Sequence, residues 1–371
     1  MAWDWNEGRA APDSDQSSRH RGPQRATLIT PHHPMNEHHA PGGGYRNPWP
    51  GATPKGFGDF LRWAGQRAVR QLRGGNSAAS TPLAIGPAAV INPRQTDGAL
   101  RATWVGHSTV LLQIGAMNVL TDPIWSERAS PVSWAGPRRF VPPAIPLASL
   151  PPLDVIVISH DHYDHLDAAT VRTLAATHPT ARWVAPLGVG ELLASLGVAQ
   201  VAELDWWQST SAADSTVTAI PAQHFSGRSL TNRDQTLWAG FAIAAEGWRV
   251  LFAGDTGYHP EFAEIARRLG PFDLVLMPIG AYSPRWFMRP VHMDPDEAAA
   301  AMADLGARAD GGGPAMLATH WGTFRLTDEP LDEPPRRVVD AWAARGLPLD
   351  RCWVLRDDRT RRLAPRPAGR A

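Results

Sequence analysis

Residues 155–165 read VIVISHDHYDH, an apolar run followed at once by three histidines and two aspartates. The apolar part predicts a short buried strand, because it consists of valine and isoleucine and carries no charge. In α/β sheets, ligands collect beyond the carboxyl ends of strands. We therefore expect His160, His162, Asp164 and His165 at a sheet edge, where a tight loop directs them to two adjacent binding positions.

This group of side chains favours a metal site over a histidine-rich surface loop, the alternative interpretation. Burying several unpaired ionisable groups costs several kcal/mol unless something such as a metal compensates them. Imidazole and carboxylate ligands suit zinc best, with manganese, iron or cobalt as substitutes. Cys352 is the single cysteine, which excludes an internal disulfide and a cysteine-rich metal site.

Three more ionisable residues each lie at the end of an apolar run and at the start of a glycine-containing loop: His224, Asp255 and His320. A lone histidine at a strand end is more often structural, but four such places recur in this chain. One loop cannot complete two coordination shells, so these three are further candidate ligands.

Two other residues have open interpretations. Asp122 ends an apolar run before Pro123, where it either orients a ligand histidine or caps the turn. His292 precedes the predicted helix N-cap Asp294, and is either a proton donor or phosphate contact or a solvated loop residue.

The order of the remaining elements predicts an α/β protein, since strands and helices alternate from about residue 100. Strands are expected at 103–114, 118–121, 154–159, 183–185, 216–220, 238–244, 248–253, 274–278 and 315–318. Helices are expected at 167–178, 187–196, 260–269, 294–305 and 335–344. The helix at 294 has a strong start signal, with Asp294 as N-cap, Pro295 at the first position and Glu297 three residues after the cap.

The chain is expected to divide into four segments. Residues 1–50 are rich in Pro, Gly, Ser and His and lack apolar periodicity, which predicts a disordered tail. Residues 51–100 form an extension whose amphipathic, arginine-rich helix at 57–72 either docks on the core or contacts a membrane surface. The hydrolase domain covers 101–356, and 357–371 form a flexible C-terminal tail.

Composition limits the classes of partner. The 371 residues contain 36 Lys and Arg and 36 Asp and Glu side chains. The net charge is therefore close to zero and gives no overall electrostatic attraction to nucleic acid. The N-terminus has no signal-peptide pattern, and no apolar run reaches eighteen residues, which predicts a cytoplasmic protein. Lys55 is the one lysine among many arginines, and alanine is abundant, which suggests a bacterial source with a GC-rich genome.

The motifs resemble those of a known family. His-x-His-x-Asp-His followed by separate His, Asp and His is the metal signature of the metallo-β-lactamase superfamily. Further runs resemble its N-acylphosphatidylethanolamine-hydrolysing phospholipase D family: WVGHST at 104–109, LTDPI at 120–124, ERASP at 127–131, ELDWW at 203–207, AGDTGY at 253–258, PIGAY at 278–282, PRWFM at 284–288 and HWGTF at 320–324. They span roughly residues 45 to 356 in the family's order.

The resemblance implies an αββα sandwich of two mixed sheets and a site with two zinc ions. It implies that His160, His162 and His224 hold one zinc, that Asp164, His165 and His320 hold the other, and that Asp255 bridges them. A hydroxide between the metals then attacks the phosphoryl group. It also implies that Asp255 and His292 take part in catalysis, and that Asp122, Tyr163 and His107 lie beside the metals or the substrate.

The activity implied is cleavage of N-acylphosphatidylethanolamine, or a related phospholipid, to an N-acylethanolamine and phosphatidic acid. Val291 stands where the mammalian form has glutamine, and Asp161 where asparagine is familiar, so the substrate does not transfer with the metal signature. A lactonase or another small-molecule hydrolase is the alternative enzyme, and a non-catalytic metal-binding protein is the alternative outside enzymes. Expected partners are a phospholipid or small ester and a membrane surface, with no nucleic acid; a dimer is compatible with the sequence.

Overall fold

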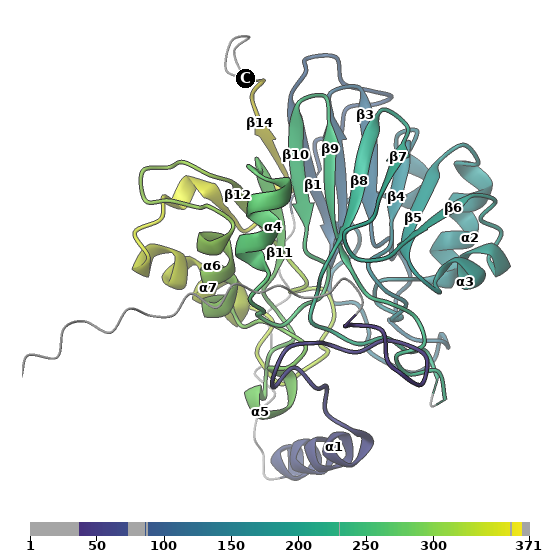
Figure 1. Ribbon diagram of the computed structural model, residues 1–371, viewed down its shortest axis with the longest axis vertical. Coiled ribbons are helices and arrows are strands. Elements are labelled where there is room, and N and C mark those ends of the chain that lie inside the picture. Colours follow the sequence, from purple (N-terminus) through teal and green to yellow (C-terminus); the bar gives the residue numbers. More distant parts are fainter. Residues whose placement is uncertain (1–36, 73–85, 87, 230, 357, 366–371) are drawn as a thin grey trace, which may run out of the picture. The chain divides into compact units, whose positions relative to one another are not determined.

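The strands of this chain form two seven-stranded sheets packed face to face in a computed structural model, which describes residues 37–72, 86, 88–229, 231–356 and 358–365 (Figure 1). In the first sheet the order is β14 (Thr360–Leu363), β1 (Leu100–Gly106), β2 (Thr109–Ile114), β3 (Met117–Thr121), β4 (Val155–Val157), β5 (Arg182–Pro186) and β6 (Val201–Leu204). In the second it is β13 (Cys352–Trp353), β12 (Ala315–Thr319), β11 (Leu274–Pro278), β10 (Trp248–Phe252), β9 (Gly240–Ala245), β8 (Ser215–Ile220) and β7 (Ser209–Ala212).

Helices lie on the outer faces of the two sheets and beyond one end of the sandwich (Figure 1). They are α1 (Phe57–Leu72), α2 (Ala168–Thr177), α3 (Gly190–Ser195), α4 (Phe262–Leu269), α5 (Arg285–Met288), α6 (Pro295–Asp304) and α7 (Glu333–Ala344), with short 3-10 turns at Leu147–Ser149 and Leu349–Arg351. Figure 1 shows α2 and α3 beside β5 and β6, and α4, α6 and α7 beside β11 and β12. The predicted αββα sandwich of mixed sheets is confirmed.

The strands are apolar on both faces because each sheet is covered twice. Leu112 and Val119 point into the core between the sheets, whereas their neighbours Leu111 and Leu120 pack against α2 and α3. This alternation follows from the two-residue period of a strand. Fully burying a side chain of this size stabilises the fold by roughly 1.5–3 kcal/mol.

Strand direction brings the predicted ligands to one end of the sandwich. β3 and β4 are parallel, as are β10, β11 and β12. β8 and β10 both pair antiparallel with β9, so they run in the same direction as each other. The carboxyl ends of β4, β8, β10 and β12 lead into residues 160–165, 224, 255 and 320.

The predicted strand at 103–114 was wrong in one respect, because it is two strands. Gly106 and His107 have positive φ values of 149° and 56°, which turn the chain tightly between β1 and β2. Apolar residues on both sides of the turn concealed it. The predicted start of the helix at 294 is confirmed, with the reciprocal capping box of Asp294 and Glu297 present.

The expected tails differ from the structure. Residues 1–36 lie outside the described residues, but residues 37–50 of the expected N-terminal tail contact the core, where Trp49 is buried. The expected C-terminal tail contains β14, which pairs antiparallel with β1. Burial of aromatic rings offsets the entropy of ordering residues 37–50. Pairing with the open edge of the sheet does the same for β14.

Helix α1 has the bounds expected, but its predicted apolar face does not dock on the core. Phe57 is 64% exposed and Leu61 is 54% exposed. Trp63 attaches the helix instead: it is buried, donates a hydrogen bond to Asp328 Oδ2 at 2.9 Å and stacks on Phe287 at 5.4 Å. Among the described residues, none of the helices is both long and apolar enough to cross a membrane.

Candidate metal centre

The first cluster at the carboxyl end of the sheets consists of three histidines. His160 and His162 follow β4, and His224 follows β8. His160 Nε2 lies 2.8 Å from His162 Nδ1, and His224 Nε2 lies 3.3 Å from the same nitrogen. Three imidazole nitrogens therefore converge on one point, an arrangement that can hold a metal ion.

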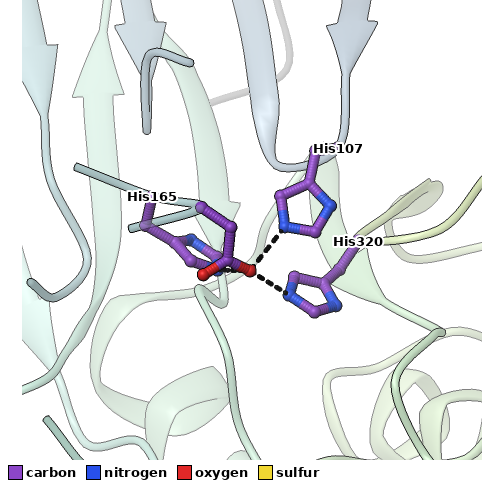
Figure 2. Close-up of side chains that lie close together, drawn as sticks. His107, His165 and His320 are labelled. Atoms are coloured by element: carbon purple, nitrogen blue, oxygen red, sulfur yellow. Dashed lines mark hydrogen bonds and ion pairs between the residues drawn. The ribbon is translucent and has the colours of Figure 1, made fainter. Parts of the chain in front are cut away.

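The second cluster surrounds the carboxylate of Asp164. Asp164 forms one group with His107, His165 and His320, and Figure 2 shows these three histidines around a carboxylate. Asp164 Oδ2 lies 2.9 Å from His107 Nε2, 3.4 Å from His165 Nε2 and 3.4 Å from His320 Nε2. His107 comes from the β1–β2 turn and His320 follows β12, so both sheets contribute to the cluster.

Asp255 lies between the two clusters. Its Oδ2 atom is 2.9 Å from His320 Nε2 and 3.0 Å from His165 Nε2, and 3.8 Å from His224 Nε2 in the first cluster. Gly254 makes this position available: its φ is +63°, and a Cβ there would lie 2.9 Å from Ser159 Cβ and 3.0 Å from the Ala239 carbonyl oxygen. Glycine thus lets β10 turn Asp255 toward both clusters.

Several buried polar atoms of the site make no well-oriented hydrogen bond with the described residues, even where a carboxylate oxygen lies nearby: His165 Nε2, Asp255 Oδ1, His292 Nδ1 and both ring nitrogens of His320. Buried polar atoms in folded proteins are nearly always satisfied. Imidazole and carboxylate atoms that face one another without partners are the donor set of a transition-metal site. The residues present therefore fit bound metal ions.

The electrostatics of the two clusters differ. Burial lowers the pKa of His162 to about 3 and that of His224 to about 4, so these imidazoles are neutral, the form that binds metal. Burial also lowers the pKa of His320, but Asp255 and Asp164 outweigh it and raise the value to about 9. The same carboxylates raise the pKa of His165 well above its ordinary value. Asp164 and Asp255 therefore favour positive charge at His165 and His320, the position where a cation would be held.

Asp122 supports one histidine of each cluster. Its Oδ2 atom lies 2.6 Å from His165 Nδ1 and accepts a 2.6 Å hydrogen bond from Ser159 Oγ, which in turn lies 2.9 Å from His160 Nδ1. Burial raises the pKa of the Asp122 carboxyl, and the contacts with His165 and Ser159 oppose that shift. Of the two interpretations of Asp122, the structure favours the one in which it orients histidines.

Three residues of the site have positive φ: His107 at 56°, Asp122 at 33° and His320 at 58°. Left-handed backbone at a residue other than glycine costs of order 1–3 kcal/mol, and such residues cluster at functional sites. In each case a strand has just ended and the side chain is directed back toward the clusters. Packing of the two sheets thus stabilises the strained backbone at these three residues, and this backbone orients their side chains toward the clusters.

His292 and Tyr163 have different surroundings. His292 is buried, and its Nδ1 lies 4.0 Å from Asp255 Oδ2. Tyr163 donates a hydrogen bond to the Arg228 carbonyl oxygen at 2.8 Å, and the Arg228 guanidinium lies 3.9 Å from its ring centroid. Tyr163 therefore anchors the 226–228 loop, whereas His292 belongs to the site itself.

Sequence reasoning missed Asn47, which holds the backbone of His224. The Asn47 Nδ2 group donates to the His224 carbonyl oxygen at 2.8 Å, and its Oδ1 accepts from the His224 N–H at 3.1 Å. Asn47 lies in the segment expected to be a tail, 177 residues from His224 in the chain. The aromatic residues Tyr45 and Trp49 beside it were the one available signal.

The beta-lactamase superfamily domain matches residues 117–321. An uncharacterized protein of Mycobacterium tuberculosis is 47% identical over 267 residues, 71% of this chain and 70% of that protein. The N-acyl-phosphatidylethanolamine-hydrolyzing phospholipase D 1 of Caenorhabditis elegans is 41% identical over 273 residues, 71% of this chain and 75% of the worm protein.

Among solved structures, a metallo hydrolase from the archaeon Ignicoccus hospitalis has the same fold. The TM-score is 0.53 at 20% sequence identity, and the match covers 71% of this chain and 98% of the archaeal chain. At this identity the likeness concerns the arrangement of sheets and helices.

Proposed function

The chain belongs to the N-acylphosphatidylethanolamine-hydrolysing phospholipase D family of the metallo-β-lactamase superfamily, and on that premise we propose that it hydrolyses N-acylphosphatidylethanolamine or a related phospholipid. Membership makes it a metal-dependent hydrolase. In the proposed reaction water attacks phosphorus, and the bond from phosphorus to the ethanolamine oxygen breaks. The leaving oxygen takes up a proton, and the products are an N-acylethanolamine and phosphatidic acid.

The observation that carries the proposal is the position of Asp255 between two clusters of nitrogen ligands. His160, His162 and His224 would hold one zinc ion and Asp164, His165 and His320 the other, with Asp255 near enough to serve both. When bound, two such ions supply a water of lowered pKa and stabilise negative charge on the phosphoryl oxygens. Asp122 and Ser159 hold His165 and His160 in orientation for this work.

His292 is proposed to act on the substrate. Burial holds its pKa well below the ordinary value, so the imidazole is neutral at physiological pH and carries one N–H. A neutral imidazole can donate a hydrogen bond to a phosphoryl oxygen or to the departing ethanolamine oxygen. Its Nδ1 lies 4.0 Å from Asp255 Oδ2, and it forms a further group of neighbouring ligand atoms with His224 and Asp255, beside the two clusters.

A cleft of about 440 Å³ beside the centre supports an anionic substrate. It is lined by Pro50, Gly51, Lys55, Gln223, Tyr258, Arg285, Trp286, Arg289, Pro290 and Glu297. Gln223 directly precedes His224, and its amide donates to the Pro290 carbonyl oxygen at 3.0 Å, so the cleft adjoins the first cluster. Lys55, Arg285 and Arg289 line the cleft with one carboxylate, Glu297, to which both arginines pair, so the lining residues carry net positive charge, which suits a phosphodiester.

Contact with a membrane is proposed through α1. Phe57, Phe60 and Leu61 are exposed, and Arg62 lies 4.9 Å from the ring centroid of Trp286, which also lines the cleft. An exposed apolar face flanked by arginines suits the interface of an anionic bilayer. We accordingly propose a cytoplasmic protein that binds peripherally to the membrane holding its substrate.

Competition among substrate classes tests the proposal. Zinc-loaded protein would hydrolyse a chromogenic phosphodiester in the presence of N-acylphosphatidylethanolamine micelles, a lactone or single-stranded RNA, with His160→Ala as the blank. We expect the lipid to inhibit strongly and the other two to have little effect. Strong inhibition by the lactone with none by the lipid would instead identify a lactonase with the same metal centre.

A further inference from the structure

Residues 37–52, here called the N-terminal strap, pass beside the candidate metal centre. The Tyr45 N–H donates to the Asp234 carbonyl oxygen at 2.8 Å. Trp49 is buried and stacks on His259 at 4.6 Å and on Trp206 at 5.7 Å. Between these contacts Asn47 bonds both backbone groups of His224. The strap therefore holds the backbone of His224, a candidate metal ligand, in position.

A second group of nitrogen and carboxylate atoms lies where the strap begins. His38 Nε2 lies 2.6 Å from Asp205 Oδ1, and His39 Nε2 lies 2.8 Å from Asp205 Oδ2. His38 is buried, with its ring stacked 4.2 Å from that of Trp206, and the side chain of His39 is 40% exposed. The two adjacent histidines thus direct the same ring nitrogen at the two oxygens of one carboxylate.

The surroundings of this group suit a bound cation. The described partners of the Asp205 carboxylate are the two histidines and the Trp206 N–H, and no arginine or lysine is among them. One ring nitrogen of each histidine and one carboxylate oxygen of Asp205 lie within 4.8 Å of one another, close enough to share a single ion. Stacking of His38 fixes the orientation of its ring, while the exposed edge of His39 leaves room for water ligands.

We propose that His38, His39 and Asp205 bind a divalent transition-metal ion of the zinc class, separate from the two ions of the catalytic centre, and that this ion fastens the strap. Two imidazoles and one carboxylate are a ligand set that zinc accepts, with water completing the shell. The ion ties the first residues of the strap to the end of β6. It thereby holds Asn47 against His224, and its loss loosens the support of the catalytic centre.

Metal analysis of the full-length protein tests this inference. The protein would be stripped with a chelator, reloaded with zinc alone, desalted and measured by inductively coupled plasma mass spectrometry. We expect three ions per chain in the wild type and two in His39→Ala and Asp205→Asn. The matched control is His178→Gln, which alters a histidine outside all of the clusters and should retain three ions.

Hydrogen exchange supplies a second readout that does not depend on turnover. Removal of zinc, or the His39→Ala substitution, should speed exchange of the amides of residues 40–46 at least tenfold. Equal zinc content in the wild type, His39→Ala and Asp205→Asn would overturn the proposal and leave the histidines as hydrogen-bond donors to Asp205. His162→Ala should lose zinc from the catalytic centre and keep the third ion, so failure of this inference is distinguishable from failure of the proposed function.

Discussion

Replacing Asp122 by asparagine is expected to weaken metal binding without unfolding the protein. The Asp122 carboxylate is fully buried and makes three contacts: with Ser159 N–H at 2.7 Å, Ser159 Oγ at 2.6 Å and His165 Nδ1 at 2.6 Å. Asparagine keeps the shape but removes the charge, and its amide presents N–H groups to one of these donors. The change therefore affects His165 directly and His160 through Ser159.

The size of the effect follows from the contacts. A hydrogen bond to a charged group contributes about 1.5–3 kcal/mol, and each 1.4 kcal/mol is a factor of ten in affinity. Loss of the charged contact to His165 thus corresponds to roughly 10- to 100-fold weaker metal binding, the range typical of residues that orient metal-binding histidines.

A competition titration against a chromophoric zinc chelator at pH 7.5 measures this effect. Asp154→Asn is the matched control, because Asp154 precedes β4 at the opposite end of the sheet and pairs with Arg94. The control should change zinc affinity by less than about threefold. Zinc affinity in Asp122→Asn equal to that of the wild type, in a folded protein, would refute the idea that Asp122 supports the metal centre.

Three further predictions concern protonation, substrate and membrane. In chelated protein, Asp255 and Asp164 raise the pKa of His320 from 6.5 to about 9 despite its burial, so the stability contributed by its charge is full below pH 6.5 and lost as pH rises through 9. Scanning calorimetry should show the Tm of chelated protein falling across that window, with no such fall after zinc loading. His292→Ala should lower kcat for the lipid by about 100-fold while metal analysis shows unchanged zinc content; loss of zinc would make His292 a ligand instead. Phe60→Ser together with Leu61→Ser should weaken sedimentation with anionic vesicles about tenfold and leave turnover of a soluble diester unchanged, whereas equal losses in both assays would make the exposed face of α1 structural.

Much of the fold and site was predictable because the chemistry of this chain is concentrated at strand ends. Apolar runs mark β4, β10 and β12 plainly, and each is followed by an ionisable residue that has no reason to lie in a core. Parallel strands bring Asp255 and His320 to one end of the second sheet, and face-to-face packing of the sheets places His160 of the first sheet at the same end. The expectation that several ligand types converge there needed no knowledge of side-chain geometry.

Long-range partners were not predictable in this way. Asn47 acts on His224 across 177 residues, and the contacts of His38 and His39 with Asp205 span 167 and 166 residues. The polar composition of the first 50 residues conceals these contacts, since their stability comes from stacking on Trp206 and His259 in another part of the chain. Likewise, the spacing of apolar residues in α1 predicted an apolar helix face, but it did not predict whether that face packs on the core or stays exposed.

The most direct test of the central claim is the fate of oxygen from water. Zinc-loaded protein would be incubated with N-acylphosphatidylethanolamine in detergent and ¹⁸O-labelled water, beside His160→Ala, and the products analysed by mass spectrometry. We predict N-acylethanolamine and phosphatidic acid from the wild type alone, with one ¹⁸O in the phosphate of phosphatidic acid. Absence of both products from protein with two zinc ions confirmed in the catalytic centre, or label in the N-acylethanolamine, would contradict the account.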